Sequence, residues 1–298
     1  MCAPARTAAA LWAAAEADWL LTYAADGGAE METTMANGAH APHRELTLRT
    51  RRRVEVRPGG GEWRALEEEL RLDPVRLAVL VCDMWDKHWC TSATRRVNEL
   101  APAMDGVVRA ARAMGAFIIH CPSETMDWYE RTPQRLRAMQ APRAEMPVER
   151  ELPNTPPLPV DASDNGCDCA VHEVVYKAWT RQTSEICIAP EDAVTDSGEE
   201  VWNLLRERGI ELVAIMGVHT NMCVLGRPFG IRRLVRLGQP VVLVRDMTDT
   251  MYNPRMPPYV SHSRGTELVV EHIERHWCPT IVSTEFTGKP AFRFSEAE

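Results

Sequence analysis

From residue 76 onward the chain alternates short apolar runs with longer amphipathic segments. The apolar runs predict strands at 77–82, 116–120, 171–176, 212–216, 241–244 and 280–282. The amphipathic segments predict helices at 95–114, 134–139, 199–208, 224–237 and 266–276, the fourth of them strained near Pro228. Such alternation is typical of a parallel sheet covered by helices on both faces. We therefore predict an α/β fold with a Rossmann-like parallel sheet of strand order 3-2-1-4-5-6.

The segments that flank residues 76–285 lack this alternation of strands and helices. Residues 1–45 are rich in alanine, glycine and methionine without a sustained period, which indicates a mobile N-terminal extension. Residues 46–75 begin with LTLRTRRRVEV, whose alternation of apolar and basic residues predicts an exposed edge strand that leads through a hairpin. The main domain is expected to span 76–285, and the polar tail at 286–298 is expected to fray.

Charge and cysteine content restrict the classes of partner. A net charge of −8 with a pI near 5.7 disfavours nucleic acid and anionic membranes, which would repel the chain. Glu16 and Asp18 interrupt the alanine-rich start where a signal peptide is uncharged. Nine cysteines, an odd number, do not suggest a disulfide framework. We expect a cytoplasmic homo-oligomer, dimer or tetramer, that acts on a small molecule without a cofactor.

The segment ELVAIMGVHTNMCVL, residues 211–225, sets Cys223 at a strand-to-helix corner. Gly217 ends the apolar run, and helical spacing begins at Met222. Free N–H groups and the positive end of the helix dipole favour an anion there, so this thiol is expected to ionise more readily than a buried one. The alternative is a core cysteine that packs as a small hydrophobe.

Three chemically active side chains follow predicted strand ends. Asp83 follows the first strand, Lys177 the third and Cys223 the fourth. In an open α/β sheet the first and fourth strands are neighbours where the strand order reverses, so Asp83 and Cys223 are expected to face one another. A carboxylate can accept a thiol proton, and a nearby ammonium can stabilise both anions. Taken singly, Asp83 could be a capping residue and Lys177 a solvated strand end.

The segments VLVCDMWD, EVVYKAW and IMGVHTNMCVLG resemble the three signature regions of the isochorismatase-like cysteine hydrolases, which include nicotinamidase and N-carbamoylsarcosine amidase. The resemblance covers residues 76 to about 283. It implies a catalytic triad of Asp83, Lys177 and Cys223. It also implies a cis peptide bond between Val218 and His219, which would direct the N–H groups of His219 and Cys223 at a developing oxyanion.

The sequence departs from the family pattern in its possible metal ligands and pocket wall. WDKHW at 85–89 replaces the family's asparagine-containing stretch, and His120 lacks the partners of the nicotinamidase metal site, so metal-assisted nicotinamide binding is not expected. Cys167 and Cys169, with His172 nearby, are closer in sequence than a Cys-x2-Cys zinc knuckle, and no second cysteine pair follows at a standard distance. We therefore predict no metal, with zinc at this pair as the less favoured alternative.

Four further residues are candidates for substrate binding. Trp85 and Trp179 each lie two residues beyond a predicted triad member and could stack on a planar substrate, or else pack beneath the long loop at 122–166. Arg181 and Gln182 could bind a carboxylate or carbonyl group, or else lie on the surface.

These observations predict a cysteine-dependent hydrolase that cleaves a C–N bond of a small amide or ureide through a covalent acyl-enzyme intermediate. Asp83 would accept the thiol proton, Cys223 would attack, and Lys177 would stabilise the charges. Two alternatives remain open, namely an acyltransferase that uses the same thioester and a non-catalytic binding or assembly protein on this scaffold. The presence of all three residue types together favours catalysis.

Overall fold

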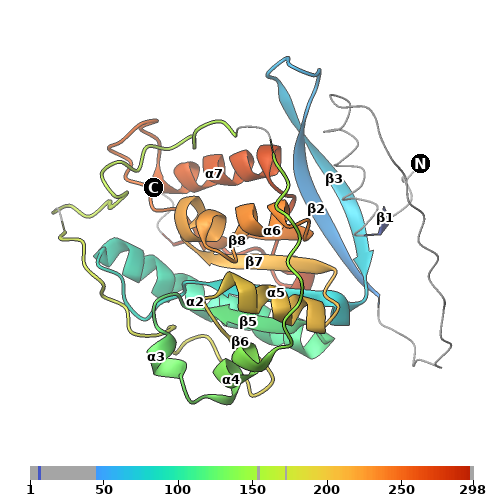
Figure 1. The fold of residues 1–298 in the computed structure, drawn as a ribbon. Coiled ribbons are helices and arrows are strands. Elements are labelled where there is room, and N and C mark those ends of the chain that lie inside the picture. Colours follow the sequence, from blue (N-terminus) through green and yellow to red (C-terminus); the bar gives the residue numbers. More distant parts are fainter. Residues whose placement is uncertain (1–5, 8–44, 153–154, 172, 296–298) are drawn as a thin grey trace.

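The computed structural model describes residues 6–7, 45–152, 155–171 and 173–295, and a nine-stranded sheet lies at its centre (Figure 1). The strands are β1 (Arg6–Thr7), β2 (Leu46–Glu55), β3 (Trp63–Leu72), β4 (Leu77–Cys82), β5 (Phe117–Cys121), β6 (Ala193–Val194), β7 (Leu212–Val218), β8 (Val241–Asp249) and β9 (Thr280–Ile281). Their order across the sheet is β1-β3-β2-β9-β8-β7-β4-β5-β6.

Helices cover both faces of this sheet. They are α2 (Thr91–Met114), α3 (Met126–Tyr129), α4 (Pro133–Gln140), α5 (Gly198–Glu207), α6 (Ile231–Arg236), α7 (His262–His276) and α8 (Thr284–Thr287), with short turns η1 (Pro74–Arg76) and η2 (Thr220–Val224). Successive strand residues point to opposite faces. In β4, Val79 and Val81 therefore pack in one core with α2, whereas Leu80 and Cys82 pack in the other with α5, α6 and α7. The predicted α/β fold is confirmed.

The third predicted strand was assigned to the wrong residues. The parallel strands run β6-β5-β4-β7-β8-β9, which has the predicted order, but its third member is Ala193–Val194. Residues 171 and 173–176 form no strand, and Val171 and Val174 are 77% and 76% exposed. A run of valines looks the same in sequence whether it lies on the surface or in a sheet, whereas a two-residue strand is too short to show a period. With β1, β2 and β3 added, the full strand order differs from the predicted six.

The basic segment at 46–56 forms an internal strand, not an edge strand. β2 pairs along its whole length with β3 and touches β9 through Arg51 and Thr280. Arg51 lies opposite Glu67 of β3, and Arg51 and Arg53 both bind the buried Glu274 of α7. The arginines were predicted to face solvent, but acidic partners on β3 and α7 neutralise them.

The two chain ends differ from expectation where they are described. The edge beside β3 is occupied by β1, which comes from the segment predicted to be a mobile extension. The rest of that segment lies outside the described residues, apart from Glu45. The tail was predicted to fray, yet Phe286 is 3% exposed, and Phe292 and Phe294 pack against the core on the α2 side. These aromatic side chains fasten the tail as far as residue 295.

The carboxyl ends of β4 and β7 lie side by side, at the point where the strand order reverses. Cys82 pairs with Gly217, so the residues that follow each strand emerge together. The helix predicted at 224–237 is instead η2, a turn of π-helix, followed by α6. Pro228 lies in the break, because proline has no N–H to donate and cannot continue a helix. Within the described part of the chain, no helix combines the length and apolar character needed to cross a membrane.

A substitution at Gly217 tests the close contact between β7 and β4. It has a φ of +121°, and a Cβ added there would lie 2.0 Å from the carbonyl oxygen of Cys82. We expect Gly217→Ala to lower the free energy of unfolding by at least about 2 kcal/mol. Gly106, inside α2, has open space around its Cβ position, so Gly106→Ala is expected to raise it by about 0.5–1 kcal/mol. Urea unfolding of both variants measures the difference, and equal midpoints would contradict it.

Candidate active site

Asp83 and Cys223 meet at the carboxyl ends of β4 and β7. Asp83 follows β4 with a φ of +47° and is fully buried, and its Oδ1 accepts the backbone N–H of Ser123 at 2.7 Å. Cys223 lies on η2, near enough to Asp83 that the negative charge of Asp83 raises the pKa of the Cys223 thiol. The Val218–His219 peptide bond is cis, and the His219 carbonyl accepts the backbone N–H groups of Met222 and Val224 on η2. The carboxylate and the thiol thus lie beside one another, and His219 precedes the turn that carries the thiol.

Arg227 is the cation that contacts this pair. Its Nε donates to Oδ2 of Asp83 at 2.9 Å, and its backbone N–H donates to the carbonyl of Cys223 at 3.0 Å. Its guanidinium also pairs with Glu124 at 3.4 Å. Sequence reasoning missed Arg227, although a signal exists, since it lies four residues after Cys223 and hence one helical turn further on.

Lys177 lies next to this group without touching it. Its Nζ donates to the backbone carbonyl of Glu124 at 2.6 Å, and among the described residues it contacts neither Asp83 nor Cys223. The segment that precedes it runs over the surface and not into the sheet. Lys177 therefore reaches Asp83 only indirectly, through the Ser123–Glu124 turn whose N–H binds the carboxylate.

Burial controls the protonation of the pair. Burial raises the pKa of Asp83, although the positive charge of Arg227 lowers it. Burial and then the negative charge of Asp83 raise the pKa of Cys223 to about 12, and Arg227 opposes this shift. The thiol was expected to ionise more readily than a buried one, but it is itself buried beside a carboxylate, and these two effects exceed those of the nearby N–H groups and Arg227. At neutral pH the proton therefore remains on sulfur.

An aromatic stack lies near Arg227, whose guanidinium is 5.9 Å from the centre of the Trp85 ring. Trp85 and Trp179 stack on each other with ring centroids 4.1 Å apart, and His88 stacks on Trp179 at 5.7 Å. Trp85 also donates through Nε1 to the carbonyl of Ser123. Nε1 of Trp179 and Nε2 of His219 are buried without a hydrogen-bond partner among the described residues. The two tryptophans therefore pack on each other. Trp179 Nε1 and His219 Nε2 remain buried polar atoms without a partner among the described residues.

Gln182 and Arg181, predicted to bind substrate, have other partners. Gln182 is 3% exposed and hydrogen-bonds to Nδ1 of His120 and to the carbonyl of Ile186. The guanidinium of Arg181 lies 4.4 Å from the centre of the Trp128 ring. Gln182 thus belongs to the core and not to the surface.

His120 is a buried core residue with both ring nitrogens occupied. Its Nδ1 contacts Gln182, and its Nε2 contacts Oδ2 of Asp192 at 3.1 Å. Arg112 also binds Asp192. The side chains that His120 meets therefore satisfy its polar atoms.

Asp86 fastens the loop that carries Trp179. Its Oδ1 accepts the backbone N–H of Thr180 at 2.9 Å, and its Oδ2 accepts the Thr180 hydroxyl at 2.6 Å. The next residues pair with the segment after β4, because Trp85 and Gln182 form an antiparallel bridge. These contacts hold Trp179 against Trp85.

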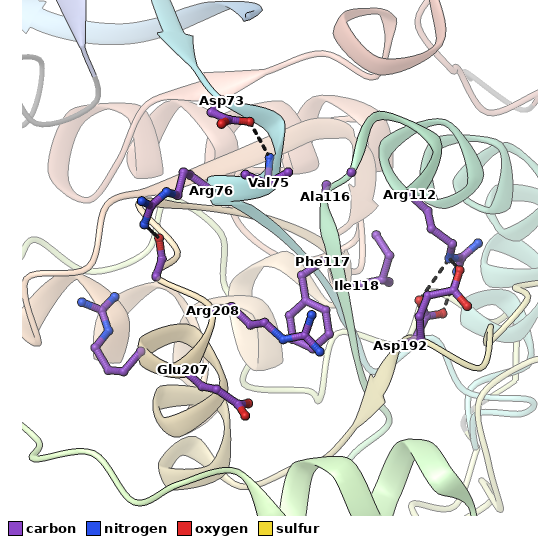
Figure 2. A pocket seen from close by; sticks show the side chains of 14 residues that line it. Asp73, Val75, Arg76, Arg112, Ala116, Phe117, Ile118, Asp192, Glu207 and Arg208 are labelled. Carbon is purple, nitrogen blue, oxygen red and sulfur yellow. Dashed lines mark hydrogen bonds and ion pairs between the residues drawn. The ribbon is translucent and has the colours of Figure 1, made fainter. Parts of the chain in front are cut away.

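Two larger cavities lie outside the Asp83–Cys223 contact. The cavity in Figure 2, of about 880 Å³, is lined by Val75, Arg76 and Phe117, near the amino ends of β4 and β5 and thus at the opposite end of the strands. Figure 2 shows its Arg112 paired with Asp192. Another cavity, of about 980 Å³, includes Arg227 and borders the site from that side.

Comparison with solved structures finds matches at low identity. A cysteine hydrolase from Pseudomonas syringae pv. phaseolicola is 16% identical over 73% of this chain and 93% of its own, with a TM-score of 0.46. An isochorismatase from Pseudomonas putida is 10% identical over 72% and 91%, with a TM-score of 0.43. An isochorismatase family protein from Burkholderia thailandensis is 14% identical over 73% and 96%, with a TM-score of 0.40.

Comparison with family models decides the assignment. A search of curated proteins finds no match to this chain. The isochorismatase domain model matches residues 77–256, more than half of the chain, and this range contains both Asp83 and Cys223. The family match supports a hydrolase. The chain belongs to the isochorismatase family.

Proposed function

We propose that this protein is a cysteine-dependent hydrolase that cleaves a C–N bond of a small amide or ureide through a thioester intermediate. The observation that carries the proposal is the burial of the Cys223 thiol beside Asp83, whose Oδ2 binds Arg227. A nucleophile in contact with a base that a third group orients is the arrangement that covalent catalysis requires.

Acylation begins with attack of the Cys223 sulfur on the substrate carbonyl carbon. Since the pKa of Cys223 is about 12, the thiolate does not exist beforehand, and the proton moves to Asp83 as the carbon–sulfur bond forms. Arg227 stabilises the developing thiolate and holds the carboxylate in place. The N–H groups of His219 and Cys223 then donate to the tetrahedral oxyanion.

Breakdown of this intermediate returns the proton. Asp83 protonates the leaving nitrogen, the C–N bond breaks, and ammonia or an amine departs from the thioester. The Asp83 carboxylate then accepts a proton from water, which attacks the thioester carbonyl. The carbon–sulfur bond breaks, the carboxylic acid is released, and the proton returns to the sulfur of Cys223.

We assign the role of the direct cation to Arg227 and a positioning role to Lys177. The bond from Arg227 to Asp83 supports the first assignment, and the bond from Lys177 to the Glu124 carbonyl supports the second. Lys177 would hold the Ser123–Glu124 turn, so that the Ser123 N–H stays directed at Asp83.

The aromatic stack favours a small substrate with polar groups. The indole N–H of Trp179 is a free donor, and burial lowers the pKa of His219 to about 3, so that its imidazole is neutral. A buried polar atom without a partner costs free energy, so a substrate that satisfies these atoms gains affinity. The oxygens and N–H groups of an amide or ureide match this need.

The first test of this function is the identity of the acylated residue. A panel of small amides and ureides, screened for release of ammonia or amine, supplies the substrate. An early acid quench is expected to leave the acyl mass on the peptide that contains Cys223, and Cys223→Ala should abolish both adduct and turnover. Cys187 is exposed, so Cys187→Ala serves as the matched control and should retain both. An adduct on any other cysteine would refute the assignment. Product analysis with an added amine distinguishes hydrolysis from acyl transfer.

The second test compares the two cations. Arg227→Gln is expected to lower kcat by about a hundredfold, since it removes a charged donor at the reacting groups. Because the charge of Arg227 lowers the pKa of Asp83, its loss should also move the acid limb of the pH–rate profile to higher pH. Lys177→Gln should lower kcat by less than about tenfold, because Lys177 acts on Asp83 only through the Ser123–Glu124 turn. It should leave the acid limb of the pH–rate profile in place. The opposite ranking of the two variants would show that Lys177 is the direct cation.

A further inference from the structure

Three cysteine sulfurs and one carboxylate meet at the start of α2. Cys90 is the residue before the helix, and its sulfur lies 3.0 Å from that of Cys167 and 3.6 Å from that of Cys169. Glu173 completes the group, and one ligand atom from each of the four side chains lies within 4.8 Å of all the others. In the described part of the chain, no other group of three or more histidine, cysteine or acidic side chains converges in this way.

The spacing of the sulfurs suits a shared metal ion. Tetrahedral zinc with Zn–S bonds of about 2.3 Å sets neighbouring sulfurs about 3.8 Å apart. The Cys90–Cys169 separation of 3.6 Å is close to this value, and the Cys90–Cys167 separation of 3.0 Å is shorter. A disulfide requires a sulfur separation of about 2.05 Å, and it would leave the third thiol unpaired. Thiolate ligands select zinc over the harder magnesium and calcium ions.

The surroundings of Cys169 favour a negatively charged sulfur. The backbone N–H of Ser92 donates to this sulfur at 3.4 Å, and the hydroxyls of Ser92 and Thr91 lie 3.2 Å and 3.3 Å from it. These groups belong to the first turn of α2, a 24-residue helix whose dipole has its positive end there. Hydrogen bonds to a ligand atom are the usual means by which a protein orients a metal ligand.

The backbone that carries Cys167 and Cys169 is fixed from outside the cluster. The residue between them, Asp168, binds Arg96 through both carboxylate oxygens, and Arg255 donates to the carbonyl of Cys169. A cavity of about 230 Å³ is bordered by Cys167, Cys169 and Glu173, which leaves room beside the ligands. These contacts hold the backbone so that the ligand atoms lie close together.

We propose that Cys90, Cys167, Cys169 and Glu173 bind a structural zinc ion. The ion would fasten the segment at 167–173 to the start of α2 and so anchor the loop that carries Trp179. Binding releases the protons of the three thiols. The proposal is independent of the chemistry at Cys223. It departs from the sequence-based expectation of no metal, because Cys90 lies 77 residues before Cys167 and no local motif includes it.

Metal analysis of the purified full-length protein, after incubation with zinc and removal of free ion, is the first experiment. We expect about one zinc ion per chain in the wild type and a loss of most of it in Cys167→Ser and Cys169→Ser. Cys187→Ser is the matched control and should keep its zinc, since Cys187 is exposed and not part of the cluster. A wild type without bound zinc, or full zinc in Cys169→Ser, would overturn the proposal.

Addition of Co²⁺ to the metal-free wild type tests the site without depending on whether a variant folds. Co²⁺ should produce a near-ultraviolet thiolate-to-metal absorption band and strong visible bands of tetrahedral geometry, and zinc should displace both. Glu173→Gln should retain the thiolate band but bind zinc more weakly, and an unchanged affinity would remove Glu173 from the ligand set. Absence of the thiolate band, with a Cys90–Cys167 disulfide in non-reducing peptide mapping, would establish a redox pair and contradict the metal site.

Discussion

The candidate site depends on one buried electrostatic contact, in which the Asp83 carboxylate is held between the Arg227 guanidinium and the Cys223 thiol. Transfer of a carboxylate from water to the protein interior costs free energy unless opposite charges and hydrogen bonds compensate for the lost hydration. Arg227 supplies the opposite charge, and the Ser123 N–H supplies a further donor. The negative charge of Asp83 raises the pKa of the Cys223 thiol, and the same carboxylate can accept the proton that the thiol loses. The buried Asp83 carboxylate therefore both binds Arg227 and controls the protonation of Cys223.

The sheet brings these groups together. β4 and β7 are neighbours at the reversal of strand order, so Asp83 and the turn that carries Cys223 leave the sheet side by side. η2 then places Arg227 one turn beyond Cys223, linked by a backbone hydrogen bond. Trp179 comes from a loop over the surface, which Asp86 fastens through Thr180. The strands β4 and β7 therefore position Asp83 and Cys223, and the loop held by Asp86 positions Trp179.

The sequence predicted the parts of this arrangement that follow from regular patterns. The apolar runs of β4 and β7 and the reversal point between them were readable, so the meeting of Asp83 and Cys223 could be expected. The position of Lys177 could not, because the valine run before it looks like a strand but lies on the surface. Arg227 was overlooked, although its spacing of four residues from Cys223 indicates one helical turn. Cys90 lies 77 residues before Cys167, and only tertiary contacts reveal that relation.

The most direct test of the central contact is the pH dependence of iodoacetamide alkylation at Cys223, followed by peptide mass spectrometry in the wild type and in Asp83→Asn. In the wild type, burial and the Asp83 charge raise the pKa of Cys223 to about 12, so alkylation should rise only at strongly alkaline pH. Asp83→Asn removes that charge and leaves Arg227, so the midpoint should move to lower pH while turnover falls by about a hundred- to ten-thousandfold. An unchanged midpoint, or turnover at the wild-type rate, would contradict the account.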